Sequence, residues 1–184
     1  CYGAGDRSRW EYDDLTFFRD LKRFGDRTCL ITEEGVTWSY AQLVRRTEEM
    51  AEHLGQERSL AFLMCRNTPS CLAAYLVCLR TGHVPLLLDA KLDVELTRTL
   101  IDSYGPDLIM SEAVPDRLAG DYDPHSSVQG IQILKSGKEA KSRLHEKLAL
   151  LLSTSGSTGN PKLVRLSAAN LDTNPGAWRG GAHG

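Results

Sequence analysis

Apolar residues in this chain gather in short, unbroken runs. Four such runs occupy residues 59–65, 84–88, 107–110 and 148–152, and polar residues, Gly or Pro flank them. Runs this short and this apolar are typical of strands that are covered on both faces of a sheet. The sequence therefore predicts four buried strands in a largely parallel sheet.

Segments with helical spacing of apolar residues separate these runs. They predict helices over 40–54, 69–79 and 93–104. Ser39 and Thr68 precede the first two as capping hydroxyls, and a Gly follows close after each of the three helices. Strands that alternate with helices in this way indicate an α/β domain, in which a layered, largely parallel sheet is flanked by helices.

Weaker patterns lie before and between these elements. We expect a short amphipathic helix at 15–24 and two short strands at 28–32 and 36–39. Residues 111–147 contain Pro, Gly and many charges, so we interpret them as mostly loop with one short strand at 128–134.

The two ends of the chain show no apolar period. We interpret residues 1–14 as an N-terminal extension and 172–184 as an unstructured tail, so that the predicted domain covers 15–171. The chain begins at Cys1 rather than at Met, so the true start of the gene product is left open.

Composition and charge narrow the possible partners. The chain has 184 residues, is 41% hydrophobic and carries a formal net charge of -2. This charge gives no electrostatic reason to expect nucleic acid as a partner. No run of about 18 apolar residues occurs, so no membrane span is expected.

Cysteine and histidine usage predicts a reducing compartment and no metal site. The five Cys form no CxxC pair, and the five His are scattered along the chain. We interpret the cysteines as small buried hydrophobes of a cytoplasmic protein, rather than as disulfide partners or metal ligands.

A hydroxyl-rich and Gly-rich loop directly follows the last apolar run. Backbone N–H groups of glycines can approach an anion closely, Ser and Thr hydroxyls add donors, and a Lys supplies positive charge. Residues with these properties fill most of positions 154–162, and they are Thr154, Ser155, Gly156, Ser157, Thr158, Gly159 and Lys162. The pattern therefore predicts a phosphate-binding loop.

Two other interpretations of this loop fit less well. A Walker A loop needs Gly-Lys-Ser/Thr after its first Gly and four further residues, whereas Lys162 lies between Pro161 and Leu163. A flexible Ser/Gly linker is the second alternative. A linker rarely follows an apolar strand directly, and here an apolar pattern resumes at once at Leu163.

The segment TSGSTGNPK at 154–162 closely resembles the signature loop of the adenylate-forming superfamily. This superfamily contains acyl-CoA synthetases, luciferases and the adenylation domains of peptide synthetases. The resemblance extends to VTWSYAQLVRRTEEMAEHL at 36–54 and to NTPSCLAAYLVCLRTGHVPLLLDAKL at 67–92, and it covers about 24–171. It implies that the chain is the first part of the large N-terminal domain of such an enzyme.

The resemblance implies a two-step reaction. A carboxylic acid attacks the α-phosphate of Mg²⁺-ATP to give an acyl-adenylate, and the acyl group then passes to coenzyme A or to the phosphopantetheine arm of an acyl carrier protein. It assigns Thr154, Ser155, Gly156, Ser157, Thr158 and Gly159 to the phosphate cradle. It gives Lys162 a catalytic and ATP-binding role through its charge.

Two positions depart from the superfamily pattern, and much of that pattern is absent. Leu163 stands where the superfamily usually has Gly, and Ala168 stands where related members have an aromatic residue or His. The expected adenine, ribose, acyl and C-terminal lysine sites lie downstream of the loop in the superfamily. We therefore expect a truncated portion that is inactive alone, and a non-catalytic nucleotide- or phosphate-binding module or remnant is the alternative.

Overall fold

The computed structural model describes residues 21–113, 122–137, 144–154 and 162–172. Its helical segments are η2 (Leu21–Phe24), α2 (Tyr40–Ala51), α3 (Pro69–Arg80), α4 (Val94–Tyr104) and α5 (Ala168–Asp172). Its strands are β1 (Thr28–Ile31), β2 (Thr37–Ser39), β3 (Leu60–Cys65), β4 (Val84–Asp89), β5 (Leu108–Ser111), β6 (Tyr122–Val128), β7 (Ile131–Ser136), β8 (Leu148–Thr154) and β9 (Lys162–Ser167).

The three long helices begin where their capping residues predict. Ser39 and Gln42 form a reciprocal capping box at the start of α2, with the Ser39 hydroxyl accepting from the Gln42 N–H at 3.2 Å. The Thr68 hydroxyl accepts from the Cys71 N–H at 3.2 Å at the start of α3. At the end of α4, Gly105 has a φ of 53°, a left-handed conformation that glycine adopts without strain.

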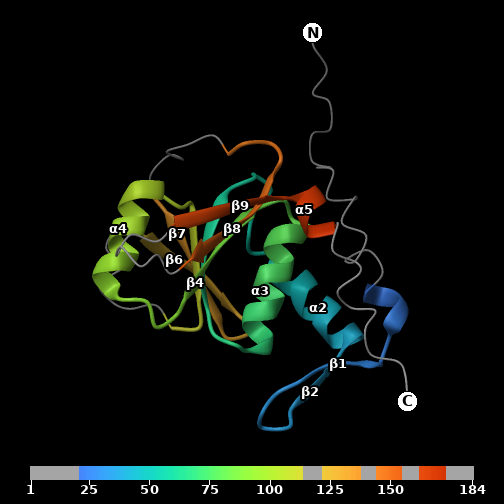
Figure 1. The fold of residues 1–184 in the computed structure, drawn as a ribbon. Coiled ribbons are helices and arrows are strands. Elements are labelled where there is room, and N and C mark those ends of the chain that lie inside the picture. Colours follow the sequence, from blue (N-terminus) through green and yellow to red (C-terminus); the bar gives the residue numbers. More distant parts are fainter. Residues whose placement is uncertain (1–20, 114–121, 138–143, 155–161, 173–184) are drawn as a thin grey trace.

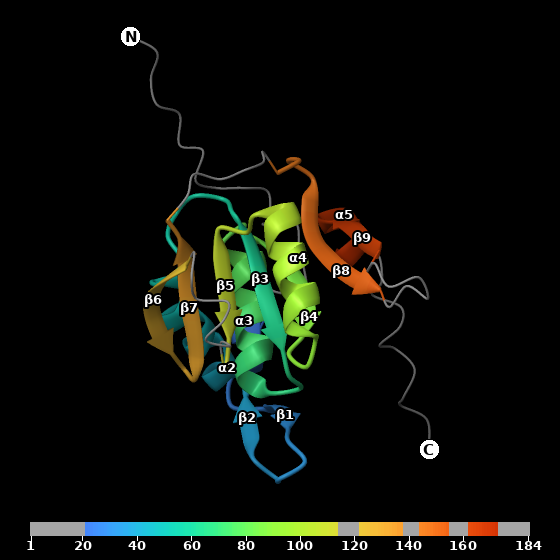
Figure 2. The same cartoon turned by 90° about the vertical axis from the view of Figure 1, so that its left-hand side faces the viewer.

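Within the described residues, seven strands form one sheet in the order β6-β7-β5-β3-β4-β8-β9. The four central strands β5, β3, β4 and β8 are parallel, and the outer pairings are antiparallel. Helices α2 and α3 cover one face of this sheet and α4 covers the other (Figures 1 and 2). The predicted α/β class, with a largely parallel sheet flanked by helices, is confirmed.

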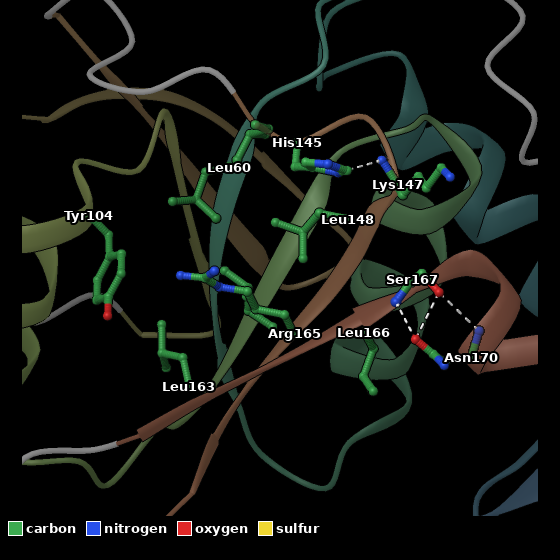
Figure 3. A pocket seen from close by; sticks show the side chains of 12 residues that line it. Leu60, Tyr104, His145, Lys147, Leu148, Leu163, Arg165, Leu166, Ser167 and Asn170 are labelled. Carbon is green, nitrogen blue, oxygen red and sulfur yellow. Dashed lines mark hydrogen bonds between the residues drawn. The ribbon is translucent and has the colours of Figure 1, made fainter.

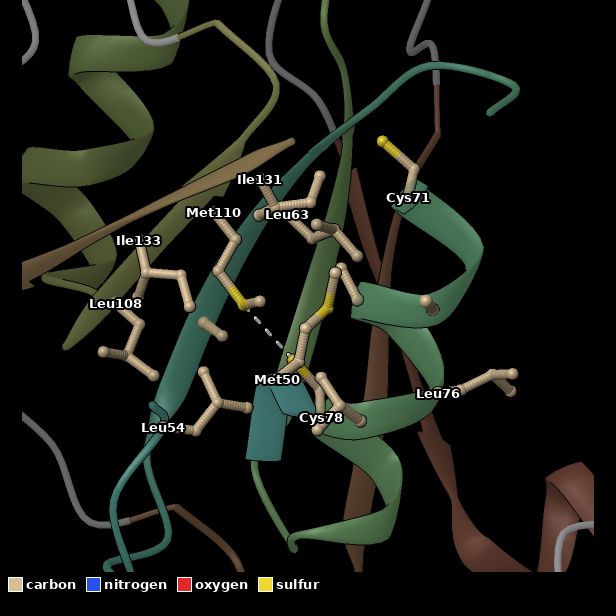
Figure 4. Close-up of a cluster of buried hydrophobic side chains, with 14 of the residues drawn as sticks. Met50, Leu54, Leu63, Cys71, Leu76, Cys78, Leu108, Met110, Ile131 and Ile133 are labelled. Atoms are coloured by element: carbon tan, nitrogen blue, oxygen red, sulfur yellow. Dashed lines mark hydrogen bonds between the residues drawn. The ribbon is translucent and has the colours of Figure 1, made fainter. Parts of the chain in front are cut away.

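The main core lies between α2, α3 and the sheet. Figure 4 shows Met50 of α2 and Cys78 of α3 facing Leu63 and Met110 of the central strands. Cys71 and Cys78 are 3% and 0% exposed, which confirms for these two that they are small buried hydrophobes, whereas Cys29 and Cys65 are only half-buried. A second core on the opposite face packs β3, β4 and β8 against α4.

The sequence interpretation of 111–147 is wrong in one respect. It allowed one strand at 128–134, but β6 and β7 form an antiparallel hairpin around Gln129 and Gly130. These two residues have φ of 55° and 81°, as a tight two-residue hairpin turn requires. Strand β6 gave no apolar pattern because it is the sheet's edge, mostly exposed, and it carries Pro124 beside an irregular pairing.

Two predicted segments lie at the start of the described region. The hairpin β1–β2 lies apart from the large sheet, as Figure 2 shows, and its strands match the predicted pair. The expected helix at 15–24 falls mostly outside the described residues, and its last four residues form the 3-10 turn η2. No helix in the described ranges is long and apolar enough to cross a membrane.

Candidate functional site

Strands β8 and β9 carry the two ends of the predicted phosphate-binding loop. Thr154 ends β8, Lys162 begins β9, and the two residues are register partners in this antiparallel ribbon. Lys162 is exposed. The structure therefore places both ends of the loop, whereas the side chain of Thr154 and residues 155–161 lie outside the described part.

The loop leaves the sheet at the edge where ligands usually bind in α/β proteins. Strand β8 runs parallel to β4 and β3, so Thr154, Asp89 and Cys65 end their strands at the same edge. In open α/β sheets, ligands bind outside the carboxyl ends of parallel strands. The sequence already predicted that the loop follows a strand of a largely parallel sheet, and the structure adds that this strand lies beside β4.

Strand β8 joins β4 through a short parallel ladder. The register pairs are Leu86 with Leu151 and Leu87 with Leu152. At the next position, the Ser153 hydroxyl donates to the Leu87 carbonyl oxygen at 3.2 Å. The bond ties β8 to β4 immediately before the loop begins. The sequence interpretation missed Ser153, because an isolated Ser at the end of an apolar run has no periodic signal.

A groove of about 530 Å³ lies beside the β8–β9 ribbon. Figure 3 shows Leu148, Arg165 and Ser167 on this ribbon, with Tyr104 of α4 across from them. Arg58 donates to the carbonyl oxygens of Leu144 and Leu148 and so holds the start of β8. The groove is lined by Leu side chains together with the basic residues His145, Lys147 and Arg165.

The departure at Leu163 has a structural reason. Its side chain is half-buried and packs against the core between α4 and the sheet, and it also lines the groove. A Gly at this position would lose that packing. Ala168, the second departure, is half-buried at the start of α5.

A second hollow of about 420 Å³ lies at the carboxyl end of β3. It is lined in part by Arg66 and Thr68 before α3 and by Cys65. The Thr68 hydroxyl donates to a Glu112 carboxylate oxygen at 2.5 Å. Burial raises the pKa of the Cys65 thiol to about 12, so this group is protonated at neutral pH and is a poor nucleophile.

No group of three or more His, Cys, Asp and Glu side chains that could hold a metal ion occurs in the ranges that the structure describes. Asp89, at the edge beside the loop, is exposed and accepts from the Lys91 N–H at 2.8 Å. Lys162 and Ser153 thus lie on the two strands that carry the ends of the loop, and Asp89 ends the neighbouring strand at the same edge. An exposed ammonium at the loop's exit suits a phosphate ligand.

Comparison with known proteins identifies this arrangement. A sequence model of the AMP-binding enzyme family matches residues 17–181, which includes the whole loop and both flanking strands. The chain belongs to the AMP-binding enzyme family. This is a family of adenylate-forming enzymes, whose general chemistry is the activation of an acid, and the resemblance inferred from the loop is confirmed.

Curated relatives of this family member are much longer proteins. The chain is 34% identical over 115 residues to a subunit of plipastatin synthase from Bacillus subtilis (strain 168), covering 61% of this chain and 4% of the relative. It is 28% identical over 152 residues to the hybrid PKS-NRPS synthetase iliA of Neonectria sp. (strain DH2), covering 77% of this chain and 4% of the relative.

Solved structures show the same fold at low identity. VinN in complex with L-aspartate matches with a TM-score of 0.62 and 22% identity, over 87% of this chain and 44% of VinN. O-succinylbenzoate coenzyme A synthetase of Bacillus subtilis, in complex with AMP, matches with a TM-score of 0.57 and 21% identity. That match covers 82% of this chain and 41% of the synthetase, so the chain spans less than half of either protein.

Proposed function

We propose that this chain supplies the phosphate-binding part of an enzyme that activates a carboxylic acid with ATP. The observation that carries the proposal is the motif at 154–162, whose ends lie at the carboxyl edge of a parallel sheet. The carboxylate oxygen attacks the α-phosphorus of ATP, and the bond from that phosphorus to the leaving pyrophosphate breaks. The products are an acyl-adenylate and pyrophosphate.

The loop acts on the leaving pyrophosphate. Negative charge builds up on this group as the bond breaks, and donors that are already oriented stabilise such charge without reorganisation. We assign this role to the backbone and hydroxyl donors of Thr154, Ser155, Gly156, Ser157, Thr158 and Gly159. The Lys162 ammonium adds a positive charge at the exit of the loop, and Mg²⁺ bound with ATP would neutralise further phosphate charge.

In a second step, a thiol attacks the acyl carbonyl carbon and AMP leaves. The similarity to a part of plipastatin synthase and to hybrid PKS-NRPS synthetases favours the phosphopantetheine arm of a carrier protein as this thiol. Coenzyme A is the alternative, since one protein of the same fold is a coenzyme A synthetase. Both steps belong to a longer protein, of which the chain supplies one portion.

A different class of function is a non-catalytic phosphate-binding module. Such a module would have the same loop and bind the same ligand, but it would need no acid substrate. The chain matches only a small part of each relative, and this favours the module as the function of the chain taken alone. The two functions differ in whether bound ATP exchanges with pyrophosphate when an acid is present.

Titration calorimetry with Mg²⁺-ATP, pyrophosphate and AMP tests the role of the loop. We expect the chain to bind ATP and pyrophosphate more tightly than AMP. Gly156→Val or Gly159→Val should abolish this binding, because a β-branched residue crowds the backbone donors and resists a positive φ. Lys162→Ala should weaken it about tenfold, as the loss of one charged donor does.

Lys147→Ala is the matched control. Lys147 is an exposed lysine at the opposite end of the same ribbon, so its removal should leave the affinity for ATP unchanged. Circular dichroism confirms that each variant is folded. Wild-type affinity in both valine variants would contradict a backbone phosphate cradle.

A further inference from the structure

The β8–β9 ribbon is held to the rest of the sheet by few bonds near the loop. Strand β9 is the sheet's outer strand and pairs only with β8 among the described strands. Strand β8 pairs with β4 at Leu151 and Leu152 and at no later position. Ser153 and Thr154, the last two residues before the loop, therefore have no register partner in β4.

The Ser153 side chain forms a bond to β4 beyond the last register pair. Its hydroxyl donates to the Leu87 carbonyl oxygen at 3.2 Å, and the residue is half-buried. Across the ribbon, Ser153 is the register partner of Leu163, and its neighbour Thr154 is the partner of Lys162. This side-chain bond to β4 thus lies next to the residue that enters the loop, and across the ribbon it lies beside the strand that leaves the loop.

We propose that Ser153 is a positioning residue, whose hydroxyl bond to Leu87 holds Thr154 and Lys162 in place for phosphate binding. This inference rests on the proposed function, since it assigns the loop to ATP. Without the bond, the last residues of the ribbon can move away from β4. The donors that follow Thr154 and the Lys162 ammonium then no longer start from a fixed place, and part of the binding energy is lost to ordering them.

Three variants test the role of this hydroxyl. Ser153→Ala removes the bond, and Ser153→Thr keeps a hydroxyl in a residue that suits a strand. Ser103→Ala is the matched control: the Ser103 hydroxyl also donates to a backbone carbonyl oxygen, that of Thr99 at 2.7 Å, but it lies in α4. The Ser103 bond is exposed, and its loss tests whether removing any serine hydroxyl far from the loop changes the amides beside the loop.

Amide hydrogen exchange of the full chain, without nucleotide, is the first measurement. We expect Ser153→Ala to speed exchange at Thr154, Lys162 and Leu163 about fivefold, the effect of one ordinary hydrogen bond. Ser153→Thr and Ser103→Ala should match the wild type at these amides. Unchanged exchange in Ser153→Ala, or equally fast exchange in Ser103→Ala, would overturn the positioning role.

Calorimetric titration with Mg²⁺-ATP is the second measurement. Ser153→Ala should bind about fivefold more weakly than wild type, and Ser153→Thr should restore the affinity. Wild-type affinity in Ser153→Ala, despite faster exchange, would show that the anchor has no part in ligand binding and would overturn the proposal. If the wild-type chain binds no ATP, the proposed function fails, and hydrogen exchange alone decides whether Ser153 fixes the ribbon.

Discussion

At the scale of single residues, a buried histidine is paired with a specific partner through one ring nitrogen, Nδ1, while its Nε2 has no hydrogen-bond partner among the described residues. His83 is fully buried at the start of the central strand β4. Its Nδ1 atom accepts from the Ser59 N–H at 3.2 Å and lies 2.7 Å from the Ser59 hydroxyl oxygen. Because burial disfavours the charged imidazolium, the pKa of His83 is lowered from 6.5 to about 4.

This lowered pKa predicts a loss of stability in mild acid. Between pH 6.5 and pH 4 the unfolded chain binds a proton at His83 that the folded chain does not, so the free energy of unfolding falls as the pH falls. The full shift corresponds to about 3 kcal/mol. Urea unfolding at pH 7 and at pH 4.5 measures most of this change.

Two variants isolate the contribution of His83. His83→Asn keeps an acceptor near Ser59 but does not titrate, so its stability should depend less on pH than that of the wild type. His125→Gln removes an exposed histidine of β6 and should keep the wild-type dependence. If His83→Asn loses as much stability between the two pH values as the wild type does, the acid sensitivity comes from other groups.

At the scale of elements, the sequence predicted those helices and strands whose signal lies within one continuous segment of the chain. Caps and apolar spacing located α2, α3 and α4, and the apolar runs located the four central strands, since each pattern arises within one segment. Strand β6 was missed because its pairing with β7, and not its own polar sequence, makes it a strand. The Ser153 anchor was missed for a similar reason: its partner Leu87 is 66 residues away.

The start of α3 provides a test at this scale. Thr68 accepts from the Cys71 N–H and also donates to Glu112, which follows β5 directly. Thr68→Ala should lower the free energy of unfolding by about 1–2 kcal/mol, because it leaves a helix N–H without its cap. Urea unfolding measures this. Thr99→Ala, which removes an exposed hydroxyl bond inside α4, should have a much smaller effect, and equal losses would contradict the capping role.

At the scale of the whole molecule, the described part of the sheet has covered central strands and exposed outer strands. The central strands are covered on both faces, whereas β9 is an edge strand on which Val164 is 41% exposed. Beside it lies the groove lined by Leu side chains and basic residues. The predicted phosphate-binding loop therefore connects an outer strand of the sheet to its neighbour.

This arrangement leads to a prediction about activity. Attack on the α-phosphorus requires the acid to be held within about 3–3.5 Å of that atom and aligned with it. The phosphate-binding loop proposed here orients only the leaving pyrophosphate, and the chain spans 44% of VinN and 41% of the coenzyme A synthetase. We therefore expect the 184-residue chain to bind Mg²⁺-ATP without catalysing carboxylate-dependent exchange of labelled pyrophosphate into ATP.

The assay compares the chain with a relative that is intact. Amino acids, aryl acids and fatty acids are tested in turn with purified chain, and the intact plipastatin synthase subunit is tested in parallel to show that exchange is detectable. Exchange above the blank that disappears in Gly156→Val would show that residues of this chain also hold the acid. The chain would then be an adenylate-forming enzyme in its own right, because a phosphate cradle alone stabilises the leaving group but brings no nucleophile to the phosphorus.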